Sequence, residues 1–216
     1  MGFIDTADYP WFTKVAERWQ EVAEELATVD RWISYGHLDM NTPSGEAVGE
    51  YLDGGWSIYP AYAGLWAEGP AFEHLCRQGG IERDEAIAIR ESLPGRFPAT
   101  HELLKDIPCI NYAAFSRMHP RTMLETHEHA QPDNHICHIG LQLPADGAAA
   151  ITVDGETHTW RDSGQVIVFD DDLPHASWNK SDDDRYILFI NFSRAVNARM
   201  TVEHRFAEYT ANLGFA

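Results

Sequence analysis

The sequence is poor in cysteine and in basic residues, and it has no long apolar run. It has only three cysteines, Cys76, Cys109 and Cys137, with no Cys-x-x-Cys spacing, which argues against a disulfide framework and predicts buried thiols. Lys and Arg number 16 against 34 Asp and Glu, and the net charge of −18 disfavours nucleic acid and anionic lipid as partners. No basic leader and no bilayer-length apolar stretch are present, so we expect no membrane partner and a cytoplasmic location.

The composition is that of a folded protein. Of the 216 residues 44% are hydrophobic, and repeats and low-complexity tracts are lacking, so we expect a single domain over 1–216. Three regions are expected within it: a helical and mixed flanking region over 1–108, a catalytic core over 109–194 and a C-terminal helix over 195–216.

Periodicity changes from helical to strand-like near the middle of the chain. Apolar spacing predicts a helix over 9–32, and a helical stretch over 82–93 precedes a Pro-Gly break and a shorter helix over 100–105. Short segments rich in β-branched and aromatic residues then alternate with turn signals such as PADG and VDGE, and predict strands at 110–118, 135–143, 148–154, 157–160, 165–170, 176–179 and 185–192. This pattern predicts a mainly β fold with flanking helices, a cupin-like jelly roll (double-stranded β-helix).

Histidines are concentrated in this strand-rich region, where six of the 11 fall within 127–175. Neutral imidazole suits Fe(II), and an oxygenase must leave metal positions open for cosubstrate and O₂. His127, near a predicted strand start, and His175, after the strand 165–170, are the candidate ligands. His129 shares a strand face with His127, so it is a candidate third ligand, a support for the ligands or a substrate contact. His158 is expected to be an exposed strand residue.

Two further residues fit a keto-dicarboxylate cosubstrate. The distal carboxylate of 2-oxoglutarate requires a buried cation, and Arg185 at the head of an apolar strand fits that role; the alternative is an exposed strand start. His138 lies within an apolar strand, where a buried imidazole needs a partner that a carboxylate would supply. Of the run Asp170–Asp172, one carboxylate is expected to orient His175 and the others to bond the turn.

Several segments together resemble the aspartyl/asparaginyl β-hydroxylase family of Fe(II)- and 2-oxoglutarate-dependent dioxygenases. The matching text, in family order, is SRMHPRT (116–122), His127, HIGL (138–141), VFDD (168–171), HASW (175–178) and Arg185. The resemblance implies a jelly roll that holds iron by two histidines, without the carboxylate of the common facial triad. It implies His127 and His175 as ligands, with Ser116, His138 and Arg185 binding 2-oxoglutarate. Family spacing favours His127 over His129 as the ligand.

The chain departs from the family at two places. The Gly-Pro-Thr-Asn stretch after the first ligand is replaced by His129-Ala-Gln-Pro132, and Ile136 stands where the family has an Arg associated with an acidic substrate. Aspartyl specificity is therefore not part of the expectation. We expect hydroxylation of an unactivated carbon in an amino acid, a carrier-tethered aminoacyl group or a peptide residue. Halogenation at the vacant ligand position ranks lower, because His129 would crowd it.

Two other readings remain open. A non-catalytic cupin-like binding module would need neither Arg185 nor Ser116, because jelly rolls host many unrelated functions. A metal enzyme that uses no keto acid would hold its ion with His127, His129 and His175. Succinate release from 2-oxoglutarate separates these readings.

Overall fold

The structure is a computed structural model that describes residues 2–34, 55–66, 72–73, 76–77, 80–107, 109–128 and 134–193. The predicted C-terminal helix over 195–216 and the candidate ligand His129 both lie outside the described residues.

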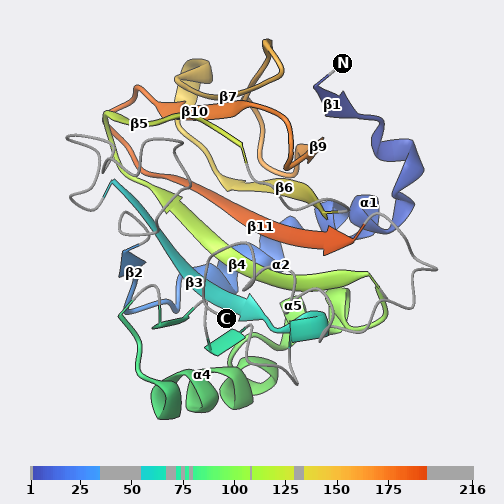
Figure 1. Cartoon of the computed structure of the whole chain (residues 1–216), viewed down its shortest axis with the longest axis vertical. Helices are drawn as coiled ribbons and strands as arrows, with labels where there is room; N and C mark the ends of the chain where they lie inside the picture. Colours follow the sequence, from blue (N-terminus) through green and yellow to red (C-terminus); the bar gives the residue numbers. More distant parts are fainter. Residues whose placement is uncertain are drawn as a thin grey trace, which may run out of the picture.

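Two antiparallel sheets face each other and form the jelly roll that the strand pattern predicts (Figure 1). The larger sheet has the order β1-β9-β6-β11-β4-β3-β2, and its strands in chain order are β1 (Phe3–Ile4), β2 (Ile33–Ser34), β3 (Trp56–Tyr62), β4 (Ile110–Met118), β6 (Asn134–Gln142), β9 (Val166–Asp170) and β11 (Arg185–Ser193). The smaller sheet has the order β5-β10-β7-β8, with β5 (Thr122–His127), β7 (Ala149–Val153), β8 (Glu156–Thr159) and β10 (His175–Asn179). The flanking region before residue 109 therefore supplies three strands of the larger sheet.

Helices cover the outer face of the larger sheet, away from the smaller one (Figure 1). They are α1 (Pro10–Glu17), α2 (Trp19–Leu26), α4 (Arg83–Arg96) and α5 (Pro98–Leu104), and short 3₁₀ turns lie at Thr6–Asp8, Gly64–Trp66 and Ala145–Gly147. No helix in the described part of the chain is long and apolar enough to cross a bilayer.

The interior has two hydrophobic cores, and side chains along β11 point alternately into one and the other. Leu188, Ile190 and Phe192 join the larger core beneath the helices. Ile187 and Phe189 point the other way, into the smaller core between the two sheets. Since side chains of a strand alternate between faces, Arg185 shares the inner face with Ile187 and Phe189. The site is built in this inner space.

The helix predictions are corrected in two places. The helix expected over 9–32 ends at Glu17 and restarts at Trp19, because the chain turns tightly at Arg18, whose N–H donates to the Val15 carbonyl. The turn brings Trp19 against Gly164, where a Cβ would lie 2.7 Å from the Trp19 ring.

The predicted break at Pro94-Gly95 is also wrong, because α4 continues to Arg96. Arg96 donates to the Tyr59 hydroxyl and to Asp30, and the next residue, Phe97, is fully buried. These tertiary contacts offset the cost of a proline in the last helical turn.

The strand β5 was not predicted as such, and His127 is its last residue rather than the start of a strand. Most of β5 is exposed or half-exposed, so its sequence lacks a clear apolar alternation. The three cysteines are free and buried, as expected. Burial raises the pKa of Cys76 to about 12 and that of Cys109 to about 11, which keeps both thiols protonated at neutral pH.

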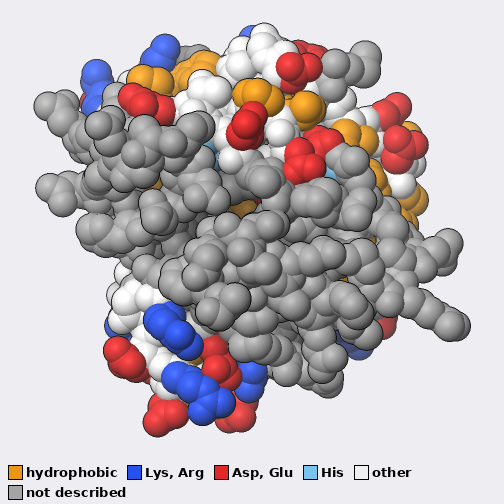
Figure 2. All heavy atoms as spheres, viewed as in Figure 1, with side chains coloured by type: hydrophobic (Ala, Val, Ile, Leu, Met, Phe, Trp, Pro, Cys, Tyr) orange, Lys and Arg blue, Asp and Glu red, His pale blue; other side chains and the backbone are white. Residues whose placement is uncertain are grey.

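Acidic side chains mark the face shown in Figure 2 around the smaller sheet, where they are interspersed with apolar ones. Basic side chains on this face gather mainly at the opposite end, over α4, where acidic side chains accompany them.

Candidate metal and cosubstrate site

The two candidate metal ligands are brought face to face by the pairing of β5 with β10. His127 and His175 are register partners in this antiparallel pair, and their ring centroids lie 4.1 Å apart. Two imidazoles at this separation can reach one ion, because cis ligands at about 2.1 Å from a metal place their nitrogens about 3 Å apart. His175 is buried, and His127 lies closer to the surface.

Each of these imidazoles is fixed by its own backbone. His127 Nδ1 lies 2.7 Å from the Glu125 carbonyl oxygen, and His175 Nδ1 lies 2.7 Å from the Leu173 carbonyl oxygen. A carbonyl only accepts, so both Nδ1 atoms donate, and in a neutral imidazole Nε2 then carries the lone pair. The second-nitrogen hydrogen bond is the usual device that orients a metal-binding histidine. Both rings are therefore prepared to ligate through Nε2.

The acidic run before His175 divides into two roles. Asp170 accepts from the backbone N–H of Asp172 at 3.1 Å and so closes the turn, as expected. Asp171 is buried, and its Oδ1 lies 3.8 Å from His175 Nε2. The orienting partner of His175 is thus the Leu173 carbonyl, and Asp171 approaches from the side that would face a metal.

Arg185 is a buried cation on the inner face of the larger sheet. Only 2% of it is exposed, which rules out the alternative of an exposed strand start. Across the described residues, its Nε and Nη1 atoms have no hydrogen-bond partner. Burial lowers the pKa of the Arg185 guanidinium to about 10, so it remains charged at neutral pH. A buried charge without a counterion calls for an anionic ligand.

His138 lies beside this cation and is also short of a partner. Its ring contacts Phe169 and Phe189 at centroid distances of 5.3 and 5.5 Å, and its Nδ1 is buried without a hydrogen bond in the part of the chain described. Burial first, and then the charge of Arg185, hold the pKa of His138 well below its usual value. A neutral His138 can donate one hydrogen bond to a carboxylate.

Ser116 faces the same space from β4, where it pairs with Ile187 of β11. Its hydroxyl oxygen accepts from Trp56 Nε1 at 2.9 Å and is almost fully buried. The Ser116 proton is left to donate to another acceptor. From the sequence, the aromatic segment 56–66 is expected to contribute to the substrate pocket, but the contact of Trp56 with Ser116 was not predicted.

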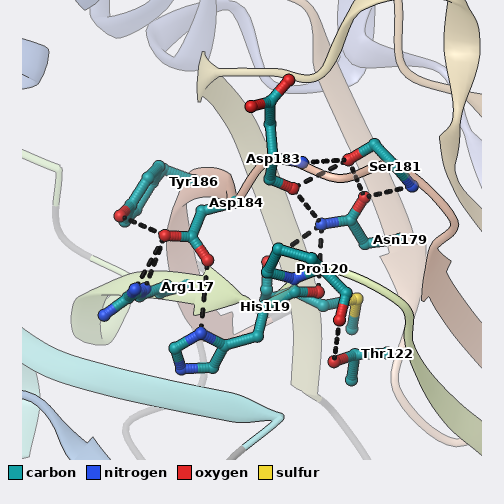
Figure 3. A network of polar contacts seen from close by, with 10 residues as sticks. Arg117, His119, Pro120, Thr122, Asn179, Ser181, Asp183, Asp184 and Tyr186 are labelled. Carbon is teal, nitrogen blue, oxygen red and sulfur yellow. Dashed lines mark hydrogen bonds and ion pairs between the residues drawn. The ribbon is translucent and has the colours of Figure 1, made fainter.

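A polar network surrounds the start of β11 (Figure 3). Its member Asp184 directly precedes Arg185, the first residue of β11. Asp184 Oδ2 accepts from the Arg117 guanidinium at 2.7 Å and from the Tyr186 hydroxyl at 3.0 Å. Beside it, the Asn179 amide donates to the carbonyls of Met118, His119 and Asp183. The end of β10, the end of β4 and the turn before Arg185 are thereby held together.

His135 and His158, the other histidines of the cluster over 127–175, do not lie beside the two candidate metal ligands. His135 points to the helical side, where its Nδ1 hydrogen-bonds the Tyr9 hydroxyl at 2.9 Å. His158 is not exposed as predicted, because its ring packs against Trp160 at 5.0 Å and its Nε2 is buried. Within the described ranges, no group of three or more His, Cys, Asp or Glu is placed to hold a metal.

Comparison with solved structures gives only matches of low similarity. The Schizosaccharomyces pombe Cnp3 cupin domain matches with a TM-score of 0.34 and 12% identity over 51% of this chain and 66% of that chain. Salicylate 1,2-dioxygenase from Pseudaminobacter salicylatoxidans matches with a TM-score of 0.31 and 17% identity over 50% of this chain and 24% of that chain.

Sequence comparison gives nearer relatives. An ornithine lipid ester-linked acyl 2-hydroxylase of Rhizobium tropici is 32% identical over 104 residues, which cover 47% of this chain and 36% of that protein. Human aspartyl/asparaginyl beta-hydroxylase is 26% identical over 194 residues, which cover 84% of this chain and 22% of that protein. The chain thus spans only about a third or less of the length of these relatives.

The family profile described as aspartyl/asparaginyl beta-hydroxylase matches residues 16–195. The match includes every candidate ligand and cosubstrate residue, from Ser116 to Arg185. Since it covers most of the chain, the protein belongs to the aspartyl/asparaginyl β-hydroxylase family.

Proposed function

We propose that this protein is an Fe(II)- and 2-oxoglutarate-dependent dioxygenase that hydroxylates an unactivated carbon. One observation supports the proposal above others: two histidines with oriented rings lie in the same sheet interior as a buried arginine that has no counterion among the residues described. A non-catalytic sugar- or metal-binding module has no use for such an arginine.

The donor set fits a ferrous ion. His127 and His175 would hold the metal through Nε2, since their Nδ1 atoms are bonded to carbonyls. Imidazole nitrogen is a borderline ligand that suits Fe(II), and two protein ligands leave positions open for a chelating keto acid and O₂. Asp171 lies close enough to hydrogen-bond a water on the metal side of His175.

The neighbouring residues fit a dicarboxylate. Arg185 would bind the distal carboxylate, because its buried Nε and Nη1 lack partners among the residues described. His138 Nδ1 and the Ser116 hydroxyl offer further donors from β6 and β4. Together these groups would neutralise, hydrogen-bond and orient the cosubstrate.

Iron, 2-oxoglutarate and O₂ supply the oxidising chemistry when bound, and the protein supplies binding and orientation. Arg185 anchors one end of the cosubstrate, which limits how its keto acid end can approach the metal. Phe169 and Phe189 line the space beside His138 and exclude water from it.

The substrate is expected to be uncharged at the reacting end. Ile136 is 1% exposed and belongs to the apolar core between the sheets, so this position provides no cation for an acidic side chain. Relatives are named for aspartyl and asparaginyl residues and for an ester-linked acyl chain. We propose an amino acid, a carrier-tethered aminoacyl group or a peptide residue as the substrate, and a cytoplasmic location.

The test is succinate release from 2-oxoglutarate in the presence of Fe(II), O₂ and candidate substrates. We expect release by the wild-type protein, loss of it in His127→Ala and Arg185→Ala, and normal release in the matched control His101→Ala, which lies on α5. Product analysis with and without chloride separates hydroxylation from halogenation. No succinate with any candidate substrate would argue against the proposal, and activity retained without 2-oxoglutarate would favour the three-histidine enzyme.

A further inference from the structure

Buried nitrogen atoms without partners are concentrated in one place. Within the residues described, eight buried side-chain atoms lack a hydrogen bond, and five of these are nitrogens of four neighbouring residues. They are His138 Nδ1, His158 Nε2, Trp160 Nε1 and Arg185 Nε and Nη1. Two of these residues, His138 and Arg185, belong to the site proposed above, and the proposed function assigns no role to His158 or Trp160.

Ring contacts connect the four residues. The Trp160 ring stacks with His138 at a centroid distance of 6.4 Å and an interplanar angle of 26°. His158 meets the same indole edge-on at 5.0 Å and 80°. After burial, electrostatic interactions with Arg185, His175 and His158 also lower the pKa of His138, so these side chains lie near His138.

Strand register orders these groups along the barrel. His175 pairs with Val153 at one end of β10, and Asn179 pairs with Ala149 at the other end, about 13 Å away for four residue steps. The backbone N–H of Trp160 donates to the Ala149 carbonyl, so Trp160 lies at the end distant from the metal ligands. Asn179 also donates to the carbonyl of Met118, which is the register partner of Arg185. The backbone of Arg185 therefore lies at the same end of the barrel as Asn179 and Trp160.

Along the barrel, His158 lies between the end with the metal ligands and the end with Trp160. It pairs with Ile151, which in turn pairs with Ser177 in the middle of β10. Ile151 is buried in the core between the sheets, and cross-strand partners share a face, so His158 also faces the interior. Its Nε2 is directed into the protein although its residue is only half buried.

We propose that Trp160 and His158 are further binding residues for the carboxylate that Arg185 holds. The inference rests on the proposed function and extends its ligand set. A carboxylate offers about four lone-pair sites, and the Arg185 fork fills only some of them. The indole N–H of Trp160 can only donate, and it is fully buried without a hydrogen-bond partner among the residues described. A carboxylate oxygen would accept its hydrogen bond.

The chemistry of the cluster selects for an anion. Trp160 Nε1 and Arg185 Nε and Nη1 can only donate, whereas His138 Nδ1 and His158 Nε2 donate in the tautomer that places the proton on that nitrogen. A buried donor without a partner is costly, and a bound carboxylate would satisfy several at once. These donors would bind a ligand less tightly if the distal carboxylate of 2-oxoglutarate were replaced by a neutral amide or were missing.

The experiment is calorimetric titration of 2-oxoglutarate into protein loaded with Mn²⁺ without iron, so that no turnover occurs. We expect Trp160→Phe and His158→Leu each to weaken binding by roughly 10- to 100-fold, the effect of losing one hydrogen bond to a charged group. His158→Gln keeps a donor and should bind more tightly than His158→Leu. Trp178→Phe, a half-buried Trp on the opposite face of β10 from the inward residues, and His101→Leu are the matched controls.

The outcomes separate the inference from the function on which it rests. If the wild type binds, Arg185→Met does not, and Trp160→Phe and His158→Leu bind like their controls, the inference is overturned and the proposed function stands. If the wild type fails to bind 2-oxoglutarate with Mn²⁺, both are overturned. Weaker binding in both variants with unchanged controls, and partial recovery in His158→Gln, supports the inference. Unfolding temperatures of the ligand-free variants identify any loss that comes from misfolding.

Discussion

Arg185 is a buried charged side chain whose loss of hydration is not compensated by the residues described. Its guanidinium is charged and 2% exposed, and two of its nitrogens lack partners in the described structure. Such a group destabilises the ligand-free protein and becomes favourable only when an anion binds. Arg185 thus lowers the stability of the ligand-free protein and favours the binding of an anion.

Arg185→Met tests this exchange. Met fits an apolar interior and removes the buried charge, so we expect the ligand-free protein to gain about 1–3 kcal/mol of unfolding free energy. The same variant should lose affinity for 2-oxoglutarate. Urea unfolding and calorimetric binding measure the two effects, and a variant that is both less stable and still able to bind would contradict the role of Arg185.

Because the pKa of His138 is lowered in the folded protein, we expect the unfolding free energy to decrease at acidic pH. Its pKa in the folded protein is held well below the unfolded value, so below about pH 6.5 the unfolded chain binds a proton that the folded chain does not. Stability from this group is complete above about pH 6.5 and falls as the pH drops, by up to about 1.4 kcal/mol per pH unit. His138→Phe should flatten the dependence between about pH 5 and 6.5 in urea unfolding. An unchanged slope would show that other groups cause it.

The chemical type of the site residues could be predicted from the sequence, but their surroundings could not. The pairing of His127 with His175 and the burial of Arg185 follow the expectations from residue type and spacing. The Trp56 contact to Ser116 depends on tertiary packing, and so does the lack of a partner for Trp160 Nε1 among the residues described. Periodicity reports which face of a strand is buried and carries no information on which buried nitrogen lacks an acceptor.

At the scale of secondary structure, several hydrogen bonds hold the turn between β10 and β11 (Figure 3). Asn179 is fully buried and makes hydrogen bonds from both ends of its amide, with Oδ1 accepting from the Ser181 hydroxyl at 2.6 Å. Its Nδ2 reaches β4 and the turn before Arg185. We therefore expect this single side chain to couple fold stability to the position of Arg185.

Asn179→Asp keeps the shape and the acceptor of the side chain but removes the donors. Three backbone carbonyls then lose a partner, and we expect the unfolding free energy to fall by about 2–4 kcal/mol, with weaker 2-oxoglutarate binding. Ser92→Ala, an exposed helical substitution, is the control. Unfolding curves close to wild type would mean that the network does not hold the turn.

Strong strands and helices were predictable, and weak ones were not. The strands 110–118 and 185–192 differ from β4 and β11 by one residue at most, because each is long and apolar on one or both faces. β5 was missed because most of its side chains are at least half-exposed. Pro94 did not end α4, since Arg96 and Phe97 are held by tertiary contacts that no local signal encodes.

For the protein as a whole, the net charge of −18 has a consequence for stability. Like charges on a compact surface repel, and salt screens that repulsion, with a screening length of about 30 Å at 0.01 M and about 8 Å at 0.15 M. We expect the unfolding temperature to rise by a few degrees between these ionic strengths. Scanning calorimetry in NaCl and in KCl measures the rise, and a fall in both salts would contradict the expectation.

The central claim is that one metal-bound 2-oxoglutarate joins His127 and His175 to Arg185. An anaerobic crystal structure with Fe(II) and 2-oxoglutarate tests it most directly. The account predicts iron on the Nε2 atoms of both histidines, the keto acid end on the iron and the distal carboxylate on Arg185. Iron bound elsewhere, or a carboxylate that makes no contact with Arg185, would contradict it.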